Sequence, residues 1–290
     1  MLIIMKRRRL AVEDHCWQDY TEQGRTIQGY LAYKEGDGDG MKIAISGKGG
    51  VGKTTIMALL GNEFKKAGKD VLIIDADPSP HMAETLGVKD VAAIRPIAEM
   101  TKLLVERSGK VEGSPFYNMN PQVNDILQDF MISHEGVKLM VLGAIQGGDK
   151  GCACPENNVL RRMLTKLLMS PDQIVLLDME AGVEHLGRGT IASVDQLLIV
   201  VIPSRSSIRT ALKIKKLAED VKIAKIDFVG NLIRDERDRT FLSEGLGVAP
   251  IAFFADSQAI RDAERAEIPI THISAPAEDT PQLLMEALNR

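Results

Sequence analysis

Glycine and lysine alternate densely between two regular segments, and this is the clearest chemical signal in the sequence. The residues are Gly47, Lys48, Gly49, Gly50, Val51, Gly52, Lys53, Thr54 and Thr55, which we call the P-loop. The spacing G-x-x-x-x-G-K-T fits a loop whose backbone N–H groups turn toward one anion, next to the positive end of a helix. We therefore predict that the P-loop holds the phosphates of ATP. The alternative is a glycine-rich turn that binds no ligand.

Two side chains of the P-loop are expected to complete this site. The Lys53 ammonium can bridge the β- and γ-phosphates, and the Thr54 hydroxyl can bind Mg²⁺. We therefore predict an ATPase that uses Mg²⁺, with Lys53 as a catalytic residue.

Carboxylates follow two other apolar segments of the chain. Asp75 and Asp77 come at the end of one segment, and Asp178 ends another. Because ligands of parallel sheets lie at the carboxyl ends of the strands, these side chains should face the nucleotide. We expect Asp178 to hold Mg²⁺ directly or through water, and Asp75 to support the shell of the metal. The alternative for Asp75 and Asp77 is a structural pair that caps the next helix.

A second candidate site is the C-x-C pair Cys152 and Cys154, which precedes a helical pattern. A thiol at the start of a helix has a lowered pKa, and a disulfide across one intervening residue is strained. Two thiolates do not fill a tetrahedral metal site, but those of two chains in a homodimer do, for Zn²⁺, Ni²⁺ or an iron–sulfur cluster. The alternative is two small residues that happen to begin a helix.

The elements expected to position these residues alternate between strands and helices. Strands are expected at 42–46, 71–75, 137–144, 174–178, 197–203, 228–233 and 251–254, because these runs are rich in Val, Ile and Leu. Helical patterns include 54–67, 157–168, 206–221 and 257–267. This order predicts an α/β fold with a doubly wound, mostly parallel sheet flanked by helices.

Composition sets the domain organisation and the compartment that we expect. Residues 1–40 end in Gly-Asp-Gly-Asp-Gly and read as a poorly structured extension or a docking arm, whereas 41–290 read as one P-loop ATPase domain. The net charge of −4 argues against nucleic acid as a partner, and the apolar runs are too short to span a membrane. With three cysteines and no secretory pattern, we expect a cytoplasmic protein. Segment 88–136 carries no recognisable motif.

The P-loop sequence K-G-G-V-G-K-T resembles the deviant Walker A motif of the MinD/ParA/nitrogenase-iron-protein class of P-loop ATPases. The resemblance implies that Lys48 reaches the phosphates of the partner subunit in an ATP-bound homodimer, and that Asp77 positions the attacking water. It also implies that D-M-E-A-G after the second strand-end acid is a switch, and that Asn231 recognises adenine. The alternatives are a solvated Lys48 and a buried Asn231 that bonds only to backbone.

Longer strings narrow the resemblance further. G-C-A-C-P-E-N, D-A-D-P-S-P, D-M-E-A-G-V-E-H-L-G-R-G and P-S-R-S-S-I-R-T-A are similar to the CooC/AcsF-type maturation ATPases, over about residues 41–290. The resemblance implies a homodimer that binds Ni²⁺, or Zn²⁺ in its place, through Cys152 and Cys154. Its client would be carbon monoxide dehydrogenase or the complex of that enzyme with acetyl-CoA synthase. His81 departs from the pattern and is either an added metal ligand or a surface or capping residue. A partitioning or positioning ATPase and an iron–sulfur carrier ATPase are the rival functions.

Overall fold

The computed structural model describes residues 40–77, 79, 81–109, 123–143, 155–168, 173–179, 194–273 and 280–289. All of these residues belong to one compact unit, Asp37–Arg290. The predicted extension, apart from its last residue, lies outside the described residues.

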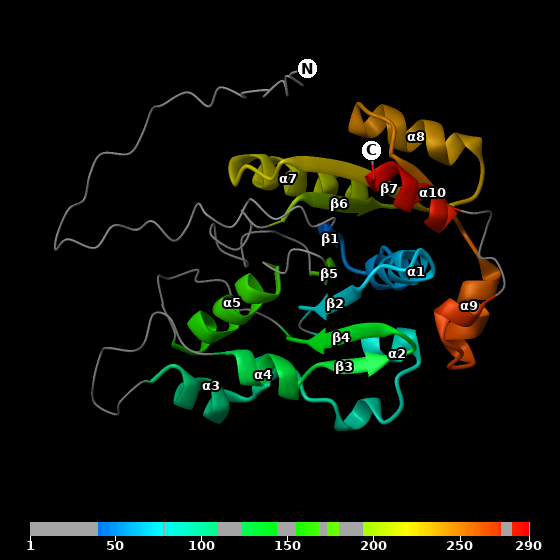
Figure 1. Ribbon diagram of the computed structural model, residues 1–290. Helices are drawn as coiled ribbons and strands as arrows, with labels where there is room; N and C mark the ends of the chain where they lie inside the picture. The colour runs from blue at the N-terminus through cyan, green and yellow to red at the C-terminus, as the bar shows by residue number, and fades with distance from the viewer. Residues whose placement is uncertain are drawn as a thin grey trace, which may run out of the picture. The chain divides into compact units, whose positions relative to one another are not determined.

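A central sheet of eight strands crosses the described part of the chain (Figure 1). The strands are β1 (Lys42–Gly47), β2 (Val71–Asp75), β3 (Ile132–His134), β4 (Val137–Val141), β5 (Ile174–Asp178), β6 (Gln196–Val201), β7 (Lys225–Ile233) and β8 (Ala252–Ala255). Their order is β3-β4-β2-β5-β1-β6-β7-β8, and every neighbouring pair is parallel except β3 with β4. The predicted doubly wound, mostly parallel sheet is therefore confirmed.

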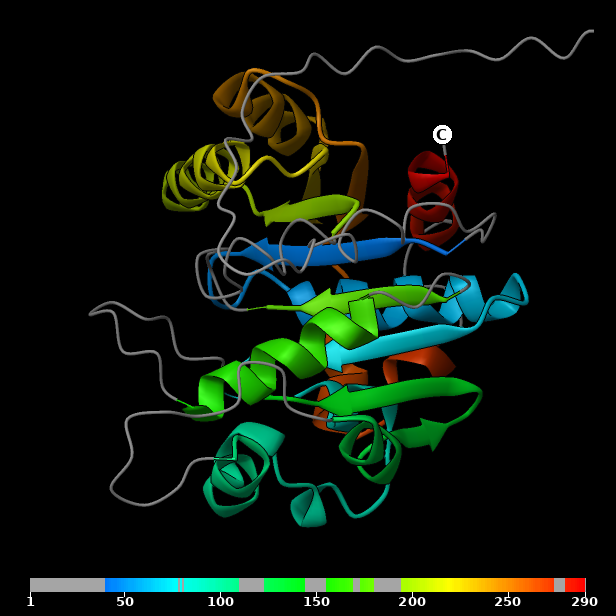
Figure 2. The same ribbon diagram turned by 60° about the vertical axis from the view of Figure 1, so that its left-hand side comes forward.

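Helices cover both faces of this sheet. They are α1 (Lys53–Lys66), α2 (Met82–Leu86), α3 (Thr101–Arg107), α4 (Asn124–Asp129), α5 (Pro155–Leu168), α7 (Arg205–Asp220), α8 (Glu236–Leu246), α9 (Gln258–Arg265) and α10 (Thr280–Leu288). One core cluster joins α3, α4, α5, α7 and α8 to one face, and a second joins α1, α2 and α10 to the other. Figure 2 shows α5 in front of the central strands and α1 behind them.

The central strands are buried along their whole length, as their composition predicts. Every residue of β1, β2, β5 and β6 is buried, and successive side chains of β1 alternate between the two core clusters. Strands covered on both faces need apolar side chains at every position, which explains their lack of polar alternation. Polar atoms at their carboxyl ends therefore meet in a desolvated place.

The segment without a motif, 88–136, holds several short elements. Two 3₁₀ turns, Val91–Ala93 and Ile97–Glu99, precede α3 and α4, and β3 adds the one antiparallel edge among the described strands. None of these elements is long enough for a helical or alternating period to stand out. The strand expected at 137–144 ends earlier, at Val141.

Phe64 in the second half of α1 tests how much of the stability depends on this packing. Its side chain is 1% exposed inside the core cluster of that face. We expect Phe64→Ala to lower the free energy of unfolding by about 3–5 kcal/mol, because it leaves a cavity between α1 and the sheet. The measurement is urea denaturation. Leu283→Ala, at a site 57% exposed on α10, is the control and should cost less than about 0.5 kcal/mol.

Candidate functional site

The strand order brings the predicted acidic residues to one edge of the sheet. β5 lies between β2 and β1, and its register pairs Asp75 with Asp178 and Ile45 with Asp178. The carboxyl end of β1 runs into the P-loop, so both strand-end acids lie beside the start of α1. This is the edge at which ligands of α/β sheets bind.

The P-loop has the backbone that an anion cradle requires. Gly50 and Gly52 have φ values of 77° and 89°, in the left-handed region that favours glycine. Gly52 is the N-cap of α1 and provides no side-chain hydrogen bond to the first turn. In contrast, Ser204, Asp235 and Ser257 cap α7, α8 and α9 with their side chains. The start of α1 therefore leaves its N–H groups for an anion rather than for a cap.

Thr54 and Asp178 form the central polar contact of the site. The Thr54 hydroxyl donates a 2.7 Å hydrogen bond to Asp178 Oδ2. Asp178 is 1% exposed, and its Oδ1 atom is buried without a hydrogen-bond partner among the described residues. A buried carboxylate oxygen without a partner is costly, and a cation is one group that would satisfy it.

Burial changes the protonation of this carboxylate. It raises the pKa of Asp178 to about 7; the Thr54 hydrogen bond opposes the shift, Asp75 adds to it, and the Lys53 charge opposes it. Lys53 is itself 8% exposed. Oxygen donors such as Thr54 and Asp178 fit Mg²⁺, which is usually held by one or two protein groups together with substrate phosphates. Within the described ranges, no group of three or more His, Cys, Asp or Glu side chains could hold a metal ion by itself.

Asp75 and Asp77 occupy different positions after β2. Asp75 is completely buried and accepts N–H groups from Asp77 at 3.2 Å and from Met82, the first residue of α2, at 3.0 Å. Burial raises the pKa of Asp75, while these two N–H groups oppose the shift. Asp77 is half-buried and accepts the Ser79 N–H at 2.9 Å. Asp75 thus accepts a hydrogen bond from the start of α2, whereas Asp77 is closer to the solvent.

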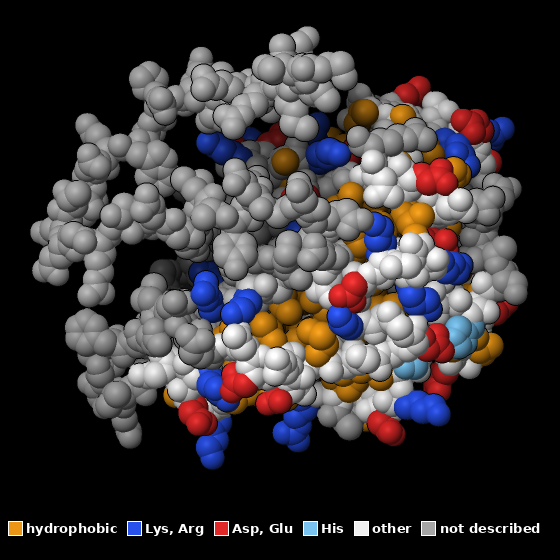
Figure 3. Space-filling model, in the orientation of Figure 1, with side chains coloured by type: hydrophobic (Ala, Val, Ile, Leu, Met, Phe, Trp, Pro, Cys, Tyr) orange, Lys and Arg blue, Asp and Glu red, His pale blue; other side chains and the backbone are white. Residues whose placement is uncertain are grey.

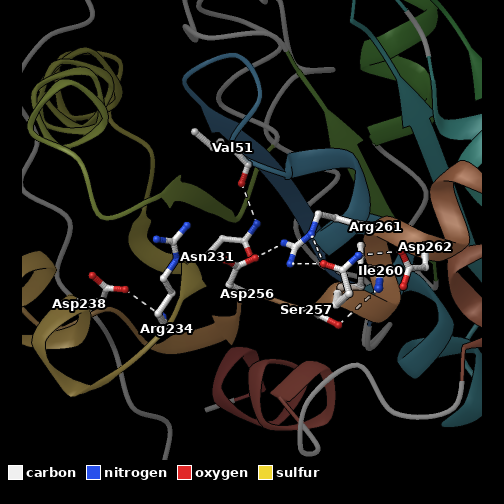
Figure 4. Close-up of polar contacts among 10 residues, drawn as sticks. Val51, Asn231, Arg234, Asp238, Asp256, Ser257, Ile260, Arg261 and Asp262 are labelled. Carbon is white, nitrogen blue, oxygen red and sulfur yellow. Dashed lines mark hydrogen bonds and ion pairs between the residues drawn. The ribbon is translucent and has the colours of Figure 1, made fainter.

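Lys48 and Asn231 both contact parts of the chain far from them in sequence. The exposed Lys48 ammonium donates a 3.0 Å hydrogen bond to Ser206 in the first turn of α7. Asn231 Nδ2 donates a 2.8 Å hydrogen bond to the carbonyl of Val51 within the P-loop (Figure 4). The spacing of residues carries no signal for either contact, although Ser206 lies inside the string P-S-R-S-S-I-R-T-A.

Some predicted residues lie outside the described part of the chain. These are Cys152 and Cys154, together with most of the switch sequence that follows Asp178. His81 is described: it is exposed, and its Nδ1 atom lies 3.5 Å from the Glu84 carboxylate. The structure therefore places His81 at the surface, beside a carboxylate on α2.

The surface of the described residues mixes charges. Figure 3 shows acidic and basic side chains interspersed across the face toward the viewer. Among the described helices, none has both the length and the apolar character needed to cross a bilayer.

Comparison with known proteins agrees with this geometry. Residues 42–249 match the family described as the CobQ/CobB/MinD/ParA nucleotide binding domain. The carbon monoxide dehydrogenase accessory protein CooC of Rhodospirillum rubrum is 39% identical over 258 residues, 86% of this chain and 96% of that protein. An uncharacterised ATP-binding protein of Methanocaldococcus jannaschii is 37% identical over 244 residues, 82% of this chain and 94% of its own length. The septum site-determining protein MinD of Pyrococcus horikoshii, solved with Mg-ADP, shares the fold with a TM-score of 0.60 at 21% identity, covering 86% of this chain and 96% of that chain.

The raised pKa of Asp178 makes the stability of the metal-free protein depend on pH. The folded state holds this proton more tightly than the unfolded state, whose carboxyl has a pKa near 3.8. The stability contributed by the bound proton is therefore present at low pH and is lost as the pH rises toward about 7. In Asp178→Asn, which cannot ionise, this loss should be absent.

In buffer with a chelator and without nucleotide, we expect Asp178→Asn to gain stability over the wild type as the pH rises. The difference in the free energy of unfolding should grow from about pH 4 and level off at about pH 8, where it reaches about 4 kcal/mol. Urea denaturation of both proteins across this range measures it. A stability difference that does not change with pH would contradict the assignment.

Proposed function

The chain belongs to the CobQ/CobB/MinD/ParA family of nucleotide-binding proteins, and from this premise we propose that it hydrolyses ATP with Mg²⁺ at the P-loop. It is a CooC-like ATP-binding protein, which confirms the resemblance predicted from its motifs. The observation that carries the proposal is the contact of Thr54 with Asp178, a carboxylate whose second buried oxygen has no hydrogen-bond partner among the described residues. In a strand–loop–helix turn that binds no ligand, burying this oxygen without a partner would only reduce stability.

Each residue of the site has a distinct part in the proposed reaction. The N–H groups of the P-loop hold the phosphates, and Lys53 adds a positive charge next to them. Thr54 and Asp178 would hold Mg²⁺, which would supply positive charge next to the transferred phosphoryl group. Asp77 is accessible enough to orient the attacking water, and Asp75 keeps the loop after β2 in place through the N–H groups of Asp77 and Met82.

We propose that ATP also joins two copies of the chain. In the single chain, Lys48 extends from the P-loop along the surface to Ser206 and is exposed. An exposed hydrogen bond of this kind is weak, so the ammonium is available to a partner. In the homodimer, Lys48 would contact the phosphates of the other subunit and stabilise charge there in the manner of an arginine finger.

The CooC-like sequence supports a role in the maturation of carbon monoxide dehydrogenase, or of its complex with acetyl-CoA synthase. We propose that Cys152 and Cys154 of both subunits bind Ni²⁺, or Zn²⁺ in its place, as cargo for that client. Four thiolates fill a tetrahedral site, which one chain cannot do with its C-x-C pair. ATP and metal would both favour the closed dimer, so each would tighten the binding of the other.

The two lysines of the P-loop should fail in different ways when each is replaced by alanine. Lys53→Ala should lose most binding of Mg-ATP, because it removes the buried cation next to the phosphates. Lys48→Ala should keep binding in the single chain but lose ATP-dependent dimerisation and slow hydrolysis by about 10³-fold or more. Calorimetry, sizing with ATP and a phosphate-release assay measure these three properties. Wild-type hydrolysis by Lys53→Ala would show that the site is elsewhere.

Replacing both cysteines of the C-x-C pair should separate the two halves of the proposal. We expect Cys152→Ala/Cys154→Ala to lose the metal that is stoichiometric with the dimer while it still binds Mg-ATP, because the cysteines lie outside the P-loop. Metal analysis after incubation with Ni²⁺ and sizing, with and without ATP, gives the readout.

Cys16→Ala is the matched control and should retain the metal, since it removes the one remaining thiol of the chain. Unchanged nickel binding by the double variant would remove the metal-carrying part of the proposal and leave the ATPase part standing.

A further inference from the structure

The side chain of Asn231 ends against the backbone of the P-loop rather than in open space. Its Nδ2 atom donates to the Val51 carbonyl at 2.8 Å, and the side chain is 8% exposed (Figure 4). Val51 is 1% exposed and directly precedes Gly52 and Lys53. The contact therefore fixes the P-loop at the point where it turns into α1.

Asn231 lies within an irregularity of β7. Gly230 pairs with Phe253 and Ile233 pairs with Ala255, so two residues of β7 oppose one residue of β8. The second of these two, Leu232, has a φ of 56°, which is unusual for a residue with a branched side chain. Bulges of this kind turn side chains out of the regular alternation of a strand, often next to functional sites.

Gly52 of the P-loop leaves room for the Asn231 amide. A Cβ atom on Gly52 would lie 2.3 Å from Asn231 Nδ2, closer than any side chain could tolerate, and Gly52 also has a φ of 89°. Glycine at this position therefore satisfies both the backbone turn and the close approach of Asn231.

Ion pairs hold the end of β7 that carries Asn231. Arg234 Nε lies 3.1 Å from Asp256 Oδ2, and Arg261 of α9 contacts the other oxygen of the same carboxylate (Figure 4). These two arginines hold the pKa of Asp256 below its usual value, with the Arg261 hydrogen bond as the larger cause. These ion pairs thus connect the end of β7 with the end of β8 and with α9.

We propose that Asn231 is a positioning residue for the phosphate loop. By holding the Val51 carbonyl, it keeps the N–H groups that follow turned toward the phosphates. This role differs from recognition of a base, because the partner of the amide is the backbone of the P-loop. It rests on the proposed function, since it assumes that the P-loop binds phosphates.

A ligand with phosphates but no base separates the two roles. Calorimetry with Mg-tripolyphosphate and with Mg-ATP is carried out on the wild type, on Asn231→Ala, and on Asn231→Leu, which keeps the number and branching of the side-chain heavy atoms but has no donor. We expect both variants to bind both ligands about five- to tenfold more weakly, the loss of one hydrogen bond to a buried carbonyl. In hydrolysis assays, the KM for ATP should rise by a similar factor.

Gln196→Ala is the matched control for a general loss of stability. Gln196 is 4% exposed and is the first residue of β6, at the edge of the sheet away from the P-loop. Its amide donates a hydrogen bond to Asp227 of β7 at 2.7 Å. This variant should bind both ligands as the wild type does, although it also loses a buried amide donor.

The outcomes are distinct. If the Asn231 variants lose affinity for ATP alone, the residue reads the base and the inference is wrong. Unchanged affinity for both ligands would also overturn it, as would an equal loss in Gln196→Ala. If the wild type binds neither ligand, it is the proposed function that fails.

Discussion

A carboxylate held in a desolvated place is the constraint around which this molecule is arranged. Asp178 sits at the end of a strand that is covered on both faces, so its charge lacks the water that would normally stabilise it. The hydroxyl of Thr54 satisfies one oxygen, and Lys53 supplies a nearby positive charge. The other oxygen of Asp178 has no hydrogen-bond partner within the described part of the chain, and a cation there would stabilise the charge. On the proposed function, the same burial would strengthen the attraction between Asp178 and Mg²⁺.

The order of the strands explains how the site comes together. β5 returns between β2 and β1, so one strand carries Asp178 between the strand of Asp75 and the strand that leads into the P-loop. A parallel sheet places all three carboxyl ends at one edge, where the N-terminus of α1 adds its potential. The helices on both faces exclude water from the strands below. The sheet therefore provides a rigid support, and the loops at its carboxyl edge carry the polar residues of the site.

The parts of the fold and site that could be predicted are those with a local signal. The P-loop is a continuous motif, and buried strands such as β5 are continuous apolar runs, so both could be read directly from the residues. β3 has three residues, and α3 and α4 have seven and six, so no period develops in them. The contacts of Asn231 with Val51 and of Lys48 with Ser206 join residues 180 and 158 positions apart. No spacing rule reaches that far, because the sheet alone brings these residues together.

The distance along the chain between Asn231 and the P-loop also bears on how the protein is made. The P-loop leaves the ribosome with the first strand of the domain, but the Asn231 amide follows 180 residues later, on β7, which β6 separates from β1 in the sheet. A nascent chain therefore has the glycine loop long before it has the means to hold that loop still. Contacts of such long range form late and slowly in folding. On the proposed role of Asn231, the P-loop would reach its full affinity for phosphates only after β7 has been synthesised and has paired with β6.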